Sequence, residues 1–311
     1  MTREAIQFSD EQEWLDLRGH DITSTASAAL FGLSPYQTEF EIYHLHKNKI
    51  KPEFSATERM RLGNALEEAI ATEVAKREGW TDLKPFKVYM RMPDERIGSS
   101  FDFECIDRDG QPLLVEIKAV DYFQWKEKWT EDEAPPHIEV QCQHELLVAD
   151  RFPRVAIVAC TGIYDYHVIY RDRDNGMGEA IRKRVAKFWR DVEQGNEPKV
   201  DYERDAEVIK AMFPNLRPDP IDMTDDPDFE NLLTRHELAS MQAKEFKKQQ
   251  DALKAEIHHK LRDAPLAYTD RFKVTAGMTK DTPDREAVAG EVIKGRKGYR
   301  QCLVKRVTPK E

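Results

Sequence analysis

The sequence predicts an α/β fold with a mixed central sheet, and three observations support this. Apolar residues recur at helical spacing within residues 56–79, at Leu62, Leu66, Ile70 and Val74. Residues 86–119 then contain runs of β-branched and aromatic residues that are typical of strands. Helix-like and strand-like segments follow one another again up to residue 193. This order favours an α/β sandwich in which helices cover a sheet of mixed strand directions.

Local signals set the expected bounds of the elements. Ser9-Asp10-Glu11-Gln12 resembles a capping box that opens the first helix, and Pro135-Pro136 opens a later one. The expected helices cover residues 10–18, 23–32, 39–49, 56–79, 135–149 and 177–193. The expected strands cover residues 86–91, 97–106, 113–119, 155–161 and 164–170.

The residues after about position 196 differ in character. Prolines punctuate an acidic stretch, and a long charged helix is expected from residue 229 to residue 262. Its sparse apolar positions are typical of a coiled-coil or docking helix. Two strand-like runs follow, at residues 268–276 and 299–307. We therefore expect three parts: a domain at 1–197, a linker at 198–228 and an accessory module at 229–311.

The composition excludes several classes of protein. No stretch approaches the roughly 20 apolar residues of a membrane span, and the first residues lack the apolar segment of a secretory signal. We therefore expect a cytoplasmic protein with no membrane association. The cysteines show no CxxC pair, which argues against a disulfide framework, a zinc site or an iron–sulfur cluster: Cys105, Cys142, Cys160 and Cys302.

The formal net charge of −10 leaves a nucleic-acid substrate open. Affinity for DNA comes from lysine and arginine side chains that neutralise phosphates. An acidic chain can still bind DNA if its basic residues line one channel while acidic residues cover the outside. Net charge therefore neither supports nor excludes this partner.

The most informative stretch is IGSSFDFECIDRDGQPLLVEIKAV, residues 97–120. Arg108-Asp109-Gly110 fits a three-residue hairpin loop that ends in a left-handed glycine. This loop pairs Phe103 with Val115 and Asp102 with Glu116. Because side chains alternate between the two faces of a strand, one face is expected to be apolar: Phe101, Phe103, Cys105, Leu113, Val115 and Ile117.

The other face of this hairpin gathers charge. It is expected to carry Asp102 and Glu104 from one strand, and Glu116 and Lys118 from the other. Carboxylates that lie opposite each other in a sheet repel. A divalent cation that prefers hard oxygen ligands would remove this repulsion, with Lys118 nearby. The alternative is an ordinary hairpin whose charged face is simply solvated.

Four segments, in this order, resemble the lambda-exonuclease/YqaJ-like viral recombinases of the PD-(D/E)XK nuclease superfamily. They are Arg18 with ITSTASAALFGLSPY, the RLGNALE helix that contains Glu67, the SFDF…VEIK hairpin, and EVQCQHELLVAD. The resemblance covers roughly residues 10–195. It implies a restriction-endonuclease-like core, with a mixed sheet flanked by helices, and a C-terminal helical and β accessory module.

The resemblance also implies roles for particular residues. Asp102 and Glu116, with the backbone carbonyl of Ile117, would ligate Mg²⁺, with Mn²⁺ as the alternative metal. Glu67 would approach the same metal from its helix, and Glu67 or Glu104 would assist a second ion. Lys118 would orient or help to deprotonate the attacking water, and Gln141 would point toward the water or Lys118. Further groups would contact the 5′-terminal phosphate of the substrate: Arg18 and Thr25.

Several of these residues also have a structural interpretation. Glu67 lies beside Glu68, and Gln141 lies two residues from Gln143, so one of each pair is expected to face the site. Arg18 ends a helix, where it would also interact with the helix dipole. Other side chains are expected in packing or surface roles, or, for the aromatic ones, in stacking on bases: His137, His144, Tyr122, Trp125 and Trp129.

The function expected from the resemblance is a metal-dependent 5′-to-3′ exonuclease. It would act on linear double-stranded DNA and leave 3′ single-stranded overhangs for phage-type recombination. The implied partners are double-stranded DNA ends, further copies in a ring-like homo-oligomer, and a single-strand annealing protein. The chain would be phage or prophage encoded and act in the cytoplasm of a bacterial host. The alternatives are an endonuclease or repair nuclease of the same fold, and a catalytically idle DNA-binding or assembly protein.

Overall fold

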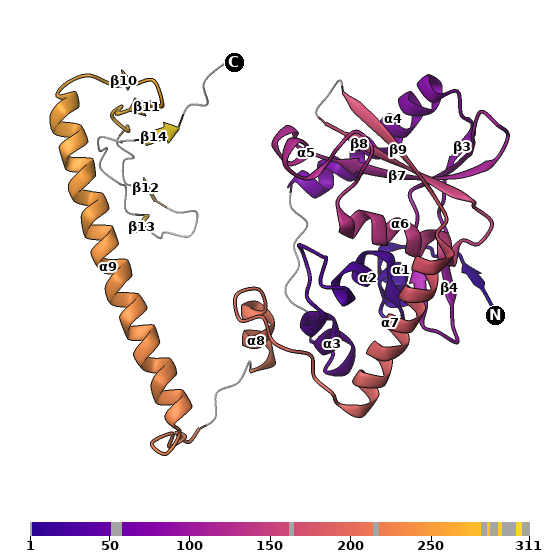
Figure 1. Cartoon of the computed structure of the whole chain (residues 1–311), viewed down its shortest axis with the longest axis horizontal. Helices are drawn as coiled ribbons and strands as arrows, with labels where there is room; N and C mark the ends of the chain where they lie inside the picture. Colours follow the sequence, from indigo (N-terminus) through magenta and orange to yellow (C-terminus); the bar gives the residue numbers. More distant parts are fainter. Residues whose placement is uncertain are drawn as a thin grey trace. The chain divides into compact units, whose positions relative to one another are not determined.

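The computed structural model of the 311-residue chain describes residues 2–50, 58–161, 165–213 and 218–280, with short strands at 285–286, 292–293 and 303–306. Contacts divide the chain into two compact units, residues 1–216 and 217–311 (Figure 1). The expected division into residues 1–197, 198–228 and 229–311 stays a prediction.

The first unit contains helices and strands in alternation. Its helices are α1 (Glu11–Arg18), α2 (Ser24–Leu30), α3 (Glu39–Lys47), α4 (Glu58–Glu78), α5 (Tyr122–Lys128), α6 (Pro136–Val148), α7 (Asn175–Gln194) and α8 (Ala206–Met212). Its strands are β1 (Glu4–Ile6), β2 (Ile22–Thr23), β3 (Thr81–Pro85), β4 (Tyr89–Met92), β5 (Ile97–Ser99), β6 (Phe103–Ile106), β7 (Pro112–Ala119), β8 (Arg154–Cys160) and β9 (Tyr166–Asp172).

A five-stranded sheet with the order β3-β6-β7-β8-β9 forms the centre of the first unit. β7 and β8 run parallel, and the other neighbouring strands run antiparallel, so the sheet is mixed. The parallel pair requires a long crossover, which α5 and α6 provide. A smaller sheet has the order β1-β4-β5-β2. The expected fold class, a mixed sheet flanked by helices, is confirmed.

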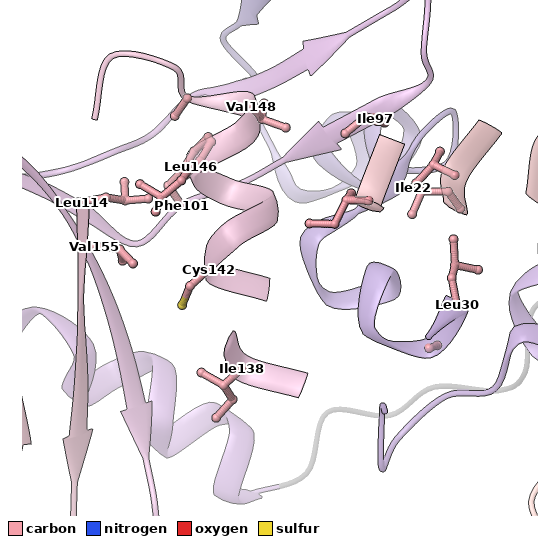
Figure 2. Packing of buried hydrophobic residues seen from close by; sticks show 14 of the residues in the cluster. Ile22, Leu30, Ile97, Phe101, Leu114, Ile138, Cys142, Leu146, Val148 and Val155 are labelled. Atoms are coloured by element: carbon pink, nitrogen blue, oxygen red, sulfur yellow. The ribbon is translucent and has the colours of Figure 1, made fainter. Parts of the chain in front are cut away.

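Apolar clusters cover both faces of the five-stranded sheet. On one face, Leu114 of β7 and Val155 of β8 pack with α6, as Figure 2 shows. On the other face, Val115 of β7 packs with Val74 of α4. This alternation along β7 buries the strand from both sides, which explains its nearly continuous apolar sequence.

The expected strand at residues 97–106 is wrong, because the chain forms two strands that belong to different sheets, β5 and β6. Between them, the ring of Phe101 stacks on that of Phe86, with 4.6 Å between the ring centroids. Phe101 therefore packs in the cluster with α6 and not on the face of Phe103. The alternation of faces holds only while a strand continues.

Several elements were not expected from the sequence, among them β3 and α5 near the central hairpin. β3 lies just before residues 86–91, where a strand was expected. The strand that forms there is β4, which begins at Tyr89 and ends at Met92. β3 pairs irregularly with β6 and most of its side chains are exposed, so it lacks the alternation that predicts a strand. α5 is a short helix whose first turn is capped by Asp121, whose carboxylate accepts hydrogen bonds from the backbone N–H groups of Phe123 and Gln124.

The second unit begins with a long helix. Its elements are α9 (Pro227–Leu261), β10 (Leu266–Tyr268), β11 (Phe272–Thr275), β12 (Arg285–Glu286), β13 (Val292–Ile293) and β14 (Leu303–Arg306). The helix expected at 229–262 is thus confirmed, and β10, β11 and β14 form a three-stranded antiparallel sheet. Parts of the expected elements lie outside the described residues, namely positions 56–57, 164, 299–302 and 307. Across the described ranges, no helix is long and apolar enough to cross a membrane.

Candidate functional site

The hairpin of β6 and β7 forms in the expected register. Ile106 pairs with Pro112, and Phe103 pairs with Val115. Gly110 adopts a φ of 76°, a left-handed conformation that glycine adopts without steric cost. Its N–H donates to the carbonyl of Asp107 at 3.1 Å and closes the turn. The loop chemistry therefore fixes which residues of the two strands face each other.

Asp102 is the residue directly before β6. Its side chain links this end of β6 to β7. Its Oδ2 accepts a hydrogen bond of 2.8 Å from the backbone N–H of Ile117. Burial raises the pKa of Asp102 well above its ordinary value, and the charge of Glu116 raises it further. The two carboxylates are thus close enough to repel, as the register predicts.

Glu116 is the centre of the cluster and is only 3% exposed. Its Oε1 accepts hydrogen bonds from the Lys118 ammonium and, at 2.6 Å, from Nε2 of Gln141. Burial alone would lower the pKa of Lys118, but the charges of Glu116 and Asp102 raise it above its ordinary value. Lys118 is therefore held as a cation by the acids around it.

Glu145 is a member of the cluster that sequence reasoning missed. It lies one helical turn after Gln141 on α6, and its Oε1 accepts a second hydrogen bond from Gln141 Nε2, at 2.9 Å. Glu145 is 1% exposed, and its Oε2 has no hydrogen-bond partner in the described part of the chain. The sequence signal for Glu145 was its spacing of four residues from Gln141, which places the two side chains on the same face of a helix.

Gln143 faces a different part of the fold, as its distance of two residues from Gln141 implies. Its Nε2 donates to the carbonyl of Asp172, and its Oε1 accepts from the N–H of Asp174. Gln143 thus joins α6 to the end of β9. Of the two glutamines, the structure brings Gln141 to the acidic cluster.

Glu67 lies on α4 and is half-buried. Burial raises its pKa, the charge of Glu116 raises it further, and that of Lys118 lowers it. Glu67 therefore lies within electrostatic reach of the cluster, on the α4 side of the sheet. Its neighbour Glu68 is exposed.

Glu104 pairs with Leu114 and so lies on the expected face of the hairpin, but its carboxylate does not join the cluster. Its carboxylate forms ion pairs with Lys84 at 3.3 Å and with Arg151. The residue that follows Asp102 by two positions belongs to β6, whereas Asp102 itself precedes the strand. A carboxylate that already has two cationic partners is a poor candidate for assisting a metal ion.

The donor chemistry of the cluster fits a hard divalent cation. The carboxylates of Asp102, Glu116 and Glu145 lie together, with Glu116 and Glu145 buried and Asp102 partly exposed, and burial with mutual repulsion raises the pKa of Asp102 and of Glu145. Such oxygens are the ligands that Mg²⁺ prefers. Among the described residues, no set of three or more His, Cys, Asp or Glu side chains is arranged to hold a metal ion. The expected ligand set of two acids and the Ile117 carbonyl requires no such triad.

The two residues expected at the 5′-phosphate lie next to each other. Arg18, the last residue of α1, donates from Nη2 to Thr25 Oγ1 at 3.3 Å, and its guanidinium lies over the Trp14 ring at 4.5 Å. Thr25 is exposed at the start of α2, within 3.2 Å of the hydroxyl oxygen of Thr23. α2 packs against α6, the helix that carries Gln141.

The aromatic residues after β7 divide into two groups. Trp129 is buried, and Trp125 stacks on both Trp129 and His167, so these rings pack within the fold. Tyr122 is exposed on α5. His144 is fully buried and its Nε2 lies 3.1 Å from the carbonyl of Gly98, which confirms a packing role.

The fold and the cluster define a class: a mixed α/β domain whose central hairpin carries buried carboxylates, a lysine and a helix-borne glutamine. Residues 13–152 match the YqaJ-like viral recombinase domain family. The resemblance noted in the sequence is confirmed for this segment, which contains all the expected site residues.

Individual proteins also resemble the chain, each at an identity of 24% or less. Uncharacterized protein YqaJ of Bacillus subtilis (strain 168) is 24% identical over 267 residues, which cover 84% of this chain and 81% of that protein. An alkaline exonuclease from Laribacter hongkongensis, LHK-Exo, is 18% identical, with a TM-score of 0.48, over 66% of this chain and 100% of that one. A phage-related exonuclease from Haemophilus somnus 129PT is 14% identical, with a TM-score of 0.40, over 56% and 94% of the two chains.

Proposed function

We propose that this chain is a metal-dependent 5′-to-3′ exonuclease that acts on linear double-stranded DNA and leaves 3′ overhangs for recombination. The observation that carries the proposal is the joining of Asp102, Glu116, Lys118 and Gln141 in one cluster around the buried Glu116 carboxylate. Its support from comparison is the match of residues 13–152 to a viral recombinase domain. Double-stranded DNA ends, a homo-oligomeric ring and a single-strand annealing protein are the proposed partners.

The metal is proposed to be held by Asp102, Glu116 and the carbonyl of Ile117, with Glu67 at the edge of the site. Bound Mg²⁺ or Mn²⁺ would lower the pKa of an attacking water and neutralise charge that grows on the scissile phosphate. The acids make the site attractive to a cation because they repel one another, and the positive charge of Lys118 offsets only part of that repulsion: the pKa values of Asp102 and Glu145 remain raised.

Lys118 serves in this proposal as a cationic hydrogen-bond donor. With its pKa held above the ordinary value by Glu116 and Asp102, its ammonium is protonated at neutral pH. A cationic donor orients the attacking water and stabilises the phosphate oxygens in the transition state. Of the two roles expected for Lys118, orientation of the water is therefore the one that we propose.

Gln141 contributes an oriented acceptor. Both hydrogens of its amide point to carboxylates, one to Glu116 and one to Glu145. Its carbonyl oxygen is then the group left to accept a hydrogen bond from the water. Arg18 and Thr25 would hold the 5′-phosphate, which places the terminal nucleotide and determines the direction of digestion.

The test is digestion of duplex DNA with the full chain. A linear duplex labelled at either end is compared with a closed circular duplex, with Mg²⁺ and with a chelator. The variants are Lys118→Ala and, as a matched control, Lys84→Ala, an exposed lysine that pairs with Glu104. We expect release of nucleotides from 5′ ends only, with metal only, in the wild type and in Lys84→Ala.

Three outcomes would contradict the proposal. Cleavage of the circular duplex would favour an endonuclease, and release from 3′ ends would reverse the direction. A wild-type chain that binds DNA but hydrolyses none would favour the catalytically idle alternative. Circular dichroism on each variant separates loss of chemistry from loss of fold.

A further inference from the structure

α9 presents apolar side chains that none of the described residues of its own unit buries. It is 35 residues long, about 52 Å at 1.5 Å per residue, and none of its residues is buried. Phe246 is 68% exposed and Leu253 is 61% exposed. Helices in proteins obtain most of their stability from packing an amphipathic face. A helix of this length with exposed leucines and phenylalanines therefore indicates a missing partner.

Four of the seven exposed large apolar residues of α9 follow a heptad repeat, namely Phe229, Leu232, Phe246 and Leu253, whereas Leu233, Leu238 and Met241 lie outside it. If Phe229 is placed at heptad position a, the a positions are Phe229, His236, Ala243, Gln250 and Ile257. The d positions are then Leu232, Ala239, Phe246, Leu253 and Lys260. Together these residues form one seam along the helix, which is the pattern of a two-stranded coiled coil. The polar members of the seam restrict which register and which partner fit.

The charge on α9 is distributed unevenly along its length. Residues 227–243 carry three acids and one base, which gives a net charge of −2. Residues 244–261 carry five bases and three acids, which gives a net charge of +2. A second α9 in antiparallel orientation places each acidic half against a basic half. A parallel copy would place like charges together, so the charge pattern selects the antiparallel arrangement.

One antiparallel register pairs apolar residues in two of the five layers of the seam, and it places a polar residue beside an apolar one in the other three: Phe229–Lys260, His236–Leu253 and Ala239–Gln250. In antiparallel coiled coils an a residue of one helix lies beside a d residue of the other. A two-fold axis between residues 244 and 245 places Ala243 beside Phe246 of the second copy, a small residue against a large one. The same register places Leu232 beside Ile257. Beside the seam, Arg235 and Glu256 are both at heptad position g, and the register brings them next to each other once on each side of the axis, with Lys254 level with Arg235.

We propose that α9 is a self-association surface, which pairs antiparallel with α9 of a second copy of this chain. The pairing rests on the sequence and exposure of α9 alone. It does not depend on the proposed nuclease activity, and it joins two copies through the second unit. The Glu256–Lys260 ion pair within the helix, at 3.1 Å, is exposed and weak enough to be exchanged for Arg235.

The test uses the full chain and two kinds of variant. Leu232→Cys and Ile257→Cys are prepared singly and together, and treated with a short bis-maleimide, with the parent chain as the control for its native cysteines. Separately, the charge of Arg235 and of Glu256 is reversed in Arg235→Glu and Glu256→Arg, and both changes are combined. Self-association is measured by sedimentation equilibrium over a micromolar range.

We expect covalent dimers from the doubly substituted chain and from a mixture of the two single variants, and none from either single variant alone. Each charge reversal should weaken self-association about tenfold, since two pairs per dimer become repulsive. The combined reversal should restore it. Cross-linking of Leu232→Cys alone would indicate a parallel pair and overturn the proposal. Absence of any cross-link would show that these two positions of α9 do not meet in a pair of copies, and would overturn it equally.

Discussion

Gln141 and Glu116 are joined across 25 positions of the sequence by a hydrogen bond of 2.6 Å. The same Gln141 nitrogen donates to Glu145 at 2.9 Å, so two carboxylates determine which way the amide points. Amide oxygen and nitrogen are exchanged by a simple flip, and only such neighbours fix the orientation. Glu145 therefore acts on the site through Gln141.

Loss of the Glu145 acceptor should reduce turnover. In Glu145→Leu, the Gln141 amide loses one of its two acceptors, and we expect kcat on linear duplex to fall about tenfold or more with KM unchanged. Glu145→Gln keeps an acceptor at the same place and should retain activity. The unfolding free energy of Glu145→Leu should change by no more than about 1 kcal/mol, since a buried and partly unpaired carboxylate is removed with it.

Glu139→Gln is the matched control for Glu145, because Glu139 lies on the same helix but pairs with Arg171. Its kcat should equal that of the wild type. Equal turnover of Glu145→Leu and the wild type would remove Glu145 from any role in the site.

Arg18 should determine the preference for phosphorylated ends. The wild type is expected to degrade a 5′-phosphorylated duplex about tenfold faster than a 5′-hydroxyl duplex, since an arginine–phosphate hydrogen bond is charge-assisted. Arg18→Ala should lose this ratio. Arg77→Ala is the control, because Arg77 also lies over an aromatic ring, that of Tyr166 at 4.3 Å. A phosphate preference that persists in Arg18→Ala would assign the contact elsewhere.

His144 should make folding stability depend on pH. Burial lowers its pKa from 6.5 to about 4. The unfolded chain therefore binds a proton between these values that the folded chain does not, so stability falls as pH falls below 6.5. At pH 5 the loss from this group is about 2 kcal/mol. Chemical denaturation at pH 7 and pH 5 should show a smaller loss in His144→Gln; an identical loss would mean that His144 is protonated in the fold.

Two glycines should respond to alanine in opposite directions. A Cβ at Gly98 would lie 2.1 Å from the Tyr89 hydroxyl oxygen, inside a packed region, so Gly98→Ala should destabilise by about 1–3 kcal/mol. A Cβ at Gly63, in α4, meets nothing within 4 Å. Gly63→Ala should stabilise by up to about 1 kcal/mol through helix propensity. Thermal unfolding of both variants checks the pair, and equal shifts would contradict the packing described around β5.

The hairpin could be predicted because its determinants are local. The Asp109-Gly110 turn sets the register, and the register brings Asp102 beside Glu116. The face of Phe101 could not be predicted, since the chain leaves one sheet for another at that point. The network of Gln141 and Glu145 depends on how α6 packs against β7, which no local pattern specifies.

Other features of the site could be predicted only in part. The four-residue spacing of Gln141 and Glu145 was visible in the sequence, but only the buried position of both residues shows that they interact. Glu104 had the right spacing for the charged face, yet Lys84 and Arg151 bind it. Alternation along a strand predicts which face a side chain is on, but it does not predict such ion pairs with residues distant in the sequence.

The most direct test of the central claim is calorimetric titration of the full chain with Mn²⁺ or Mg²⁺, without DNA. We predict saturable binding by the wild type, at least about tenfold weaker binding by Asp102→Asn, and unchanged binding by Glu104→Gln, whose carboxylate lies on the same hairpin but pairs with Lys84 and Arg151. Binding of equal affinity in Asp102→Asn and the wild type would contradict the claim that the acids of this cluster hold the metal.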